Sequence, residues 1–105
     1  VVTKVDNDTC ELKDIATEEK YRGKGYAKKM IKYLCDNYKQ KYNKMLIGTT
    51  ENNIPFYVKQ GFDKYEKTIK NFFVDNYDEK IWDGDLYCTD MYYYSKNLKM
   101  NNSKE

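Results

Sequence analysis

Histidine is absent from the 105 residues of this chain. Its absence excludes catalytic triads built on histidine, metal sites with histidine ligands and imidazole general bases. Any acid or base that works near neutral pH must therefore be a Glu, Asp, Tyr, Lys or Cys side chain.

Cysteine is scarce, with only Cys10, Cys35 and Cys88. Their number is odd and no pair has C-x-x-C spacing, so the sequence indicates neither a disulfide framework nor a zinc site. We expect no metal cofactor and a reducing, cytoplasmic location. The apolar runs are also short, which predicts neither a membrane-spanning helix nor a signal peptide, and no membrane partner.

A large excess of charge of one sign is missing as well. Lys plus Arg number 19 against 17 for Asp plus Glu, a net charge of +2. So small a net charge creates no strong field toward nucleic acid. The run Tyr92–Tyr94 lies near lysines and could stack on bases, but alternating tyrosines of a strand are more typical of a core or a subunit interface. We therefore predict no nucleic-acid partner, and any anion site must be local.

At this length the chain is expected to form one domain, which we place at residues 1–98, followed by a polar tail at 99–105. Two strands, Val1–Val5 and Cys10–Thr17, are predicted to form a hairpin around a turn rich in Asp and Asn. The alternation of the second strand slips by one residue at Asp14–Ala16, which predicts a β-bulge.

A helix is predicted from Gly25 onward because apolar residues recur there with helical spacing. These residues are Ala27, Met30, Ile31, Leu34, Cys35 and Tyr38. The apolar run Met45–Ile47 that follows suits a parallel strand buried on both faces. Residues 10–47 are therefore predicted to form a βαβ unit with its helix on one face of the sheet.

A short second helix is predicted after the polar loop that follows this unit. Asn52 or Asn53 is the expected N-cap residue, and Pro55 lies in the first turn. Gly61 is expected to end the helix in a left-handed conformation.

Two strands rich in aromatic residues, Phe62–Ile69 and Leu86–Ser95, are expected to complete the sheet as an antiparallel pair. Asp83–Gly84 provides a turn between them. The chain is thus predicted to have an α/β fold, α+β in some schemes, with a mixed and mostly antiparallel sheet around the βαβ unit.

The stretch Arg22–Ala27 precedes the first helix and is suited to hold an anion. Gly23 and Gly25 allow positive φ and close approach of the backbone, and a helix N-terminus presents unpaired N–H groups. Arg22 and Lys24 add positive charge. We expect a phosphate group as the ligand; the alternative is an ordinary surface turn.

Arg22, Gly25 and Ala27 match the R/Q-x-x-G-x-G/A signature of the GCN5-related N-acetyltransferases (GNAT), and the chain resembles small bacterial members of this family over nearly its whole length. A second match is Tyr57, which precedes Gly61 and its following Phe by four residues. The resemblance implies a GNAT-like fold, acetyl-coenzyme A as co-substrate, and transfer of the acetyl group to a primary amine of a small molecule or peptide.

The resemblance also implies the residues of the site. Tyr57 corresponds to the tyrosine that protonates the departing thiolate, and Glu11 has the spacing from Arg22 of the basic glutamate in histone-modifying members. Backbone amides near residues 15–17 correspond to the donors for the thioester carbonyl. The coenzyme-binding residues implied are Ile15, Ala16, Thr17, Arg22, Gly23, Lys24, Gly25, Tyr26, Ala27 and Asn52. The alternatives are a solvent-facing strand carboxylate at Glu11 and a tyrosine that only packs at Tyr57.

Complete domains of this family begin with a strand, one or two helices and another strand before such a hairpin. This sequence begins within the hairpin, so we expect the N-terminal part of the domain to be absent. A homodimer or a separate N-terminal segment is then an expected partner, because an uncovered edge strand invites association. Two other functions stay open: an acyl-coenzyme A binding module without turnover, and acetylation of a hydroxyl group.

Overall fold

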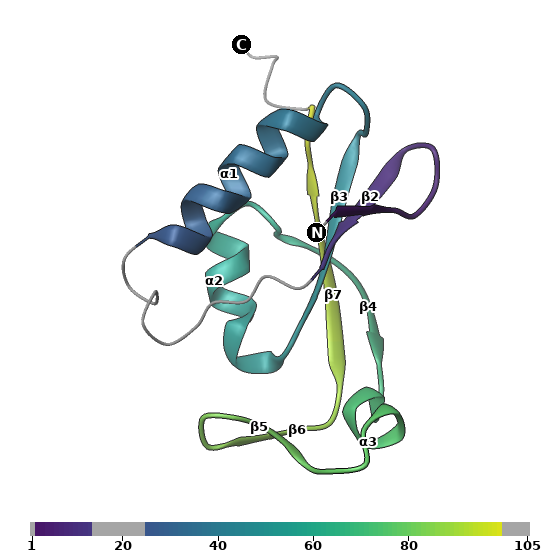
Figure 1. Ribbon diagram of the computed structural model, residues 1–105, viewed down its shortest axis with the longest axis vertical. Coiled ribbons are helices and arrows are strands. Elements are labelled where there is room, and N and C mark those ends of the chain that lie inside the picture. Colours follow the sequence, from purple (N-terminus) through teal and green to yellow (C-terminus); the bar gives the residue numbers. More distant parts are fainter. Residues whose placement is uncertain (1, 14–24, 100–105) are drawn as a thin grey trace.

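A five-stranded sheet with the strand order β1-β2-β3-β7-β4 forms the centre of the computed structural model, which describes residues 2–13 and 25–99 (Figure 1). Its strands are β1 (Val2–Lys4), β2 (Thr9–Leu12), β3 (Lys44–Thr49), β4 (Lys64–Ile69) and β7 (Met91–Asn97). The helical segments in this part of the chain are α1 (Tyr26–Tyr38), the 3-10 turn η2 (Glu51–Asn53), α2 (Ile54–Lys59) and α3 (Phe72–Asn76). A separate two-stranded sheet consists of β5 (Ile81–Asp83) and β6 (Leu86–Cys88).

The pairing of the strands confirms the predicted topology. β1 and β2 form an antiparallel hairpin, β2 and β3 are parallel, and β7 is antiparallel to both β3 and β4. The hairpin turn is closed by the Asp6 carboxylate, which accepts hydrogen bonds of 2.8 Å from the N–H groups of Asp8 and Thr9. The hairpin, the βαβ unit and the mixed, mostly antiparallel sheet are therefore as expected, whereas the predicted bulge at residues 14–16 lies outside the described residues.

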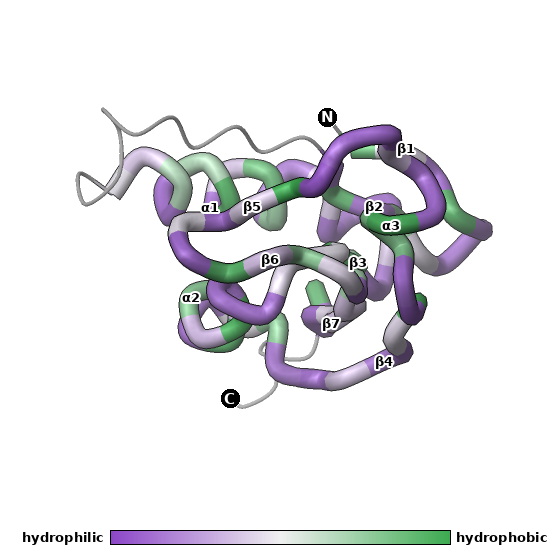
Figure 2. The backbone as a smooth tube through the Cα atoms, turned by 90° about the horizontal axis from the view of Figure 1, so that it is seen from below, coloured by the Kyte–Doolittle hydropathy of each residue, from purple (hydrophilic) through white to green (hydrophobic). Residues whose placement is uncertain are grey.

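Helices α1 and α2 lie on the same face of the sheet (Figures 1 and 2). Ile31 and Cys35 are the buried residues of α1, as its apolar periodicity predicts. Met30 was expected on the buried face, but it is 51% exposed. It precedes Ile31 by about 100° around the helix and so lies at the edge of the apolar stripe. None of the helices in the described ranges is long and apolar enough to cross a membrane.

Alternation along β2 and β3 assigns each residue to one face of the sheet. The residues that point into the core under α1 are Cys10, Leu12, Met45 and Ile47. Glu11 and Leu46, which are register partners, therefore point to the opposite face. Leu46 is only half-buried, so the prediction that this strand is buried on both faces was wrong. Because α1 and α2 cover only one face, Glu11 lies on the open face.

The predicted strand Leu86–Ser95 is divided in two. Its first part, β6, pairs with β5 across a two-residue turn in which Gly84 has φ +62°, and only β7 joins the main sheet. A tight local turn closes a hairpin at a lower entropic cost than pairing with the distant β4, which explains the division. The sequence had not indicated α3, which lies between β4 and β5.

The predicted asparagine cap of α2 was also wrong in its chemistry. Asn53 is the N-cap residue, but its backbone is already helical and its side chain makes no cap hydrogen bond. The preceding turn η2 leads directly into α2, and the amide of Asn53 instead donates to Thr50 Oγ1 at 3.3 Å and to Asp83 Oδ2 at 3.4 Å.

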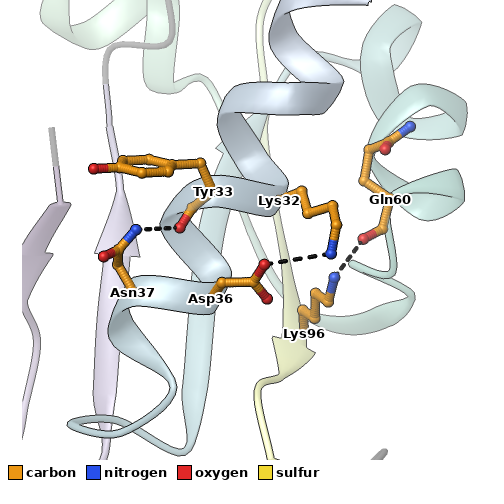
Figure 3. A network of polar contacts seen from close by, with 6 residues as sticks. All are labelled: Lys32, Tyr33, Asp36, Asn37, Gln60 and Lys96. Atoms are coloured by element: carbon orange, nitrogen blue, oxygen red, sulfur yellow. Dashed lines mark hydrogen bonds and ion pairs between the residues drawn. The ribbon is translucent and has the colours of Figure 1, made fainter.

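Gly61 ends α2 with φ +101°, as expected, and the side chain of Lys96 from β7 lies against it. Figure 3 shows Lys96 pointing to Gln60, the residue before this glycine. Lys96 Nζ donates a 3.0 Å hydrogen bond to the carbonyl oxygen of Gln60 at the end of α2. A Cβ atom at Gly61 would lie 3.0 Å from Lys96 Cε. The positive φ therefore favours glycine here, and a Cβ atom would also push the Lys96 side chain aside.

We expect Gly61→Ala to lower the free energy of unfolding by more than Gly84→Ala. Both changes place alanine at positive φ, which costs about 1 to 2 kcal/mol, but a Cβ atom at Gly84 meets nothing within 4 Å. Only the change at Gly61 must also displace Lys96. Urea unfolding of the two variants measures the difference, and equal losses would contradict a stabilising role for the Lys96 contact.

Candidate functional site

A cleft of about 500 Å³ opens at the carboxyl ends of β2 and β3. Its walls come from the ends of these two strands, the connection from β3 to α2, α2 itself, α3 and the start of β7. The carboxyl ends of parallel strands are where ligands bind in α/β sheets, because the chain leaves the sheet there toward the flanking helices. The volume is in the range of small-molecule sites.

Glu11 lines this cleft from the open face of the sheet. Its neighbour Tyr93 belongs to β7, and burial together with the nearby Glu11 carboxylate raises the pKa of Tyr93. The Tyr93 ring lies against Gly48, its register partner, where a Cβ atom would be 2.8 Å from Tyr93 Cε2. Glycine at position 48 therefore allows this ring to lie across the floor of the cleft.

Tyr57 lines the same cleft from α2. Its ring packs edge-on against Phe56 at 5.1 Å and Phe62 at 6.1 Å between centroids, next to the core. Burial raises the pKa of the Tyr57 phenol, so the hydroxyl stays protonated at neutral pH. The two predicted catalytic residues, 46 positions apart in the chain, are thus brought to one cavity.

The connection from β3 to α2 is held in place by Asp83 of β5. Thr50 Oγ1 donates to Asp83 Oδ2 at 2.9 Å, and the amide of Asn52 donates to the Asp83 carbonyl oxygen at 3.1 Å. Asn52, expected to contact a coenzyme, therefore has an intramolecular partner and does not belong to the described lining of the cleft. The sequence had indicated Asp83 only as a turn residue, since its partners are about 30 positions away.

The N-terminus of α1 has the features of an anion site. Gly25 is the N-cap residue, with φ +79°, and a Cβ atom there would meet none of the described residues within 4 Å. Tyr26 and Ala27 begin the helix, and its first turn contains no acidic residue. Space around this glycine among the described residues and the positive end of the helix fit a negatively charged ligand. The remaining predicted coenzyme contacts lie outside the described residues: Ile15, Ala16, Thr17, Arg22, Gly23 and Lys24.

The aromatic wall of the cleft was not predicted. Phe72, Phe73 and Tyr77 line it from α3 and the residue that follows α3, and Met91 and Tyr93 line it from β7. The signal for it in the sequence is the adjacent pair Phe72-Phe73 within a long connection. Two neighbouring phenylalanines indicate a segment that packs against the rest of the protein rather than a loop exposed to water.

Comparison with known proteins identifies the family of this chain. Residues 1–64 match the acetyltransferase (GNAT) domain. The chain is similar to a GNAT family acetyltransferase from Elizabethkingia anophelis solved with acetyl-CoA bound, with 35% identity, a TM-score of 0.82 and coverage of 91% of this chain and 65% of that one. It is also similar to a Bacillus subtilis acetyltransferase solved in complex with CoA, with 26% identity, a TM-score of 0.76 and coverage of 90% and 64%.

A curated relative is the glucosamine 6-phosphate N-acetyltransferase of Trypanosoma brucei brucei, which is 32% identical over 60 residues. The match covers 56% of this chain and 41% of that enzyme, so the chain spans less than two thirds of the length of each of these relatives. The domain match nevertheless extends over more than half of the chain, and the solved structures share its fold almost throughout. The chain belongs to the GNAT acetyltransferase family.

Proposed function

We propose that this chain binds acetyl-coenzyme A and transfers the acetyl group to a primary amine. One observation carries the proposal: Tyr57 reaches the cleft from the face covered by α1 and α2, and Glu11 reaches it from the open face. Acetyl-coenzyme A bound on the helix side and an amine bound on the open side would therefore meet in the cleft. Tyr57 would be the proton donor there, and Glu11 the proton acceptor. The name of the curated relative supports nitrogen rather than oxygen as the acceptor atom.

The N-terminus of α1 is the proposed site for the pyrophosphate of the coenzyme. Gly25 leaves room for close approach, and the N–H groups of Tyr26 and Ala27 point from the positive end of the helix. Two solved relatives hold acetyl-CoA or CoA, which supports this ligand. Residues 22–24 and the backbone amides of residues 15–17 complete the proposed contacts, and Asn52 would contribute after exchanging its bond to Asp83.

Acetyl-coenzyme A, when bound, supplies a thioester whose carbon accepts a nucleophile. An alkyl amine has a pKa near 10.4, so only about one molecule in 10³ is neutral at pH 7. Glu11 is proposed to take a proton from the ammonium group, which frees the nitrogen lone pair for attack on the acetyl carbon. Tyr57 is proposed to give its proton to sulfur as the carbon–sulfur bond breaks, and its raised pKa keeps that proton available.

Two measurements on the same preparation test the function. Calorimetry with coenzyme A tests donor binding, and release of the free thiol from acetyl-coenzyme A in the presence of a panel of amines and alcohols tests transfer. We expect binding together with amine-dependent thiol release. Binding without release for any acceptor would favour the alternative of a binding module, release with alcohols alone would favour O-acetylation, and absence of coenzyme binding would refute the proposal.

A further inference from the structure

The open-face side of the cleft is lined mainly by aromatic rings. Phe72 and Phe73 have centroids 5.1 Å apart in an edge-on arrangement, and Phe73 stacks on Tyr77 at 5.9 Å with an angle of 26°. Tyr93 lies on the other side, next to Glu11. Figure 2 places α3 on the side of the sheet opposite α1 and α2, in agreement with the register that puts Glu11 on the open face.

The aromatic wall is fixed rather than loosely attached. The N–H of Asn71, which has φ +58°, donates to Asp90 Oδ1 at 2.9 Å, and the N–H of Phe73 donates to the Thr89 carbonyl oxygen at 3.0 Å. Both acceptors belong to the connection between β6 and β7. Tyr93 is held between Gly48 below and Lys67, whose Nζ lies 5.1 Å from its ring centroid. A wall held by such bonds is preorganised for a flat ligand.

The charged side chains in the described lining of the cleft are one carboxylate, that of Glu11, and one ammonium group, that of the exposed Lys13. The ammonium group of Lys67 lies close by, over the Tyr93 ring. One carboxylate beside several aromatic rings suits a single ammonium group attached to an aromatic body, with the cation near Glu11.

We propose that the acceptor is an arylalkylamine, a primary amine joined to an aromatic ring by a short aliphatic chain. Its nitrogen lies toward Glu11, and its ring packs against Phe72 and Phe73. This inference rests on the proposed function and adds the class of acceptor to it. The chemistry is that of the proposed function. Glu11 takes a proton from the bound ammonium group, the nitrogen lone pair then forms the nitrogen–carbon bond, and the carbon–sulfur bond breaks as sulfur receives the proton of Tyr57. The second proton that nitrogen loses returns to Tyr57 through solvent.

The test compares phenethylamine with butylamine, glucosamine 6-phosphate and spermidine as acceptors. We expect kcat/KM for phenethylamine to exceed that for butylamine by about 10-fold, because only the aromatic amine can stack in the cleft. Phe73→Leu should remove most of this ratio by raising KM for phenethylamine. Val74→Ala is the matched control, since Val74 is the next residue of α3, is 47% exposed and should leave the ratio unchanged.

Each outcome bears on one proposal. Acetylation of amines with no preference for phenethylamine, or with preference for the sugar phosphate or spermidine, would overturn the acceptor class while the acetyltransferase function stood. If no amine is acetylated, titration of the chain with phenethylamine, with and without coenzyme A, decides: binding that Phe73→Leu weakens and Val74→Ala preserves supports the aromatic site, and absence of binding overturns it. Failure of coenzyme A to bind refutes the function alone.

Discussion

Tyr57→Phe is expected to lower kcat by about 10² to 10³ while the affinity for coenzyme A stays nearly the same. The hydroxyl is needed only as the carbon–sulfur bond breaks, so its removal affects the transition state and not the bound ground state. The ring remains, and its edge-on contacts with Phe56 and Phe62 persist. Steady-state kinetics and calorimetry on the same variant measure the two quantities.

The control for this prediction is Tyr33→Phe, the same loss of a hydroxyl at a residue of α1 that is 66% exposed. It should leave kcat unchanged. If Tyr57 is only structural, its variant should instead lose thermal stability and keep its turnover, and that result would remove the acid role. Burial raises the pKa of Tyr57, so any fall of kcat from its ionisation should occur only above its ordinary pKa of about 10.

Gly25→Glu is expected to weaken binding of coenzyme A by about 10² or more. The new carboxylate would occupy the open space at the N-terminus of α1, where a negative charge a few ångströms from the pyrophosphate costs several kcal/mol at an intermediate effective dielectric constant. The helix itself should persist, since an acidic residue at its N-terminus interacts favourably with the helix dipole. Calorimetry with coenzyme A gives the change in Kd.

Two variants separate charge from backbone strain in this experiment. Gly25→Ala imposes the same strain at φ +79° without a charge and should change Kd by less than about 5-fold. Gly84→Glu adds the same charge at another open glycine with positive φ, in the turn between β5 and β6, and should leave Kd unaltered. Equal affinity of Gly25→Glu and the parent chain would remove the α1 site from the proposed function.

The asymmetry of the cleft fits the two ligands of the proposed function. The parallel pair β2 and β3 points its alternate residues to opposite faces, so α1 and α2 cover the core side, and the other side is the one we propose for the acceptor. Glu11 and Tyr57 line the same cleft at the strand ends. The chemistry thus depends on the pleat of the sheet as much as on the identity of the two residues.

Local sequence was sufficient wherever the signal spans only a few residues. The periodicity after Gly25 predicted α1, the turn residues near Asp6 predicted the first hairpin, and Gly61 predicted the end of α2. Prediction from local sequence failed where a residue distant in the chain offered a competing hydrogen bond. Asn53 has the side chain of a helix cap, but Asp83 lies close enough to take its hydrogen bond.

By itself, the sequence determined the order of the elements from β1 to α2, the βαβ unit, the family signature and both residues proposed for proton transfer. These follow from hydrophobic periods and short motifs, which depend on neighbours in the chain. Only the tertiary structure decided that Tyr93 lies over Gly48, that Asp83 holds the connection from β3 to α2, and that α3 supplies an aromatic wall. Each of these contacts joins segments about 20 to 45 positions apart. Contacts of this kind are selected by packing in three dimensions, and they produce no periodic pattern in the sequence.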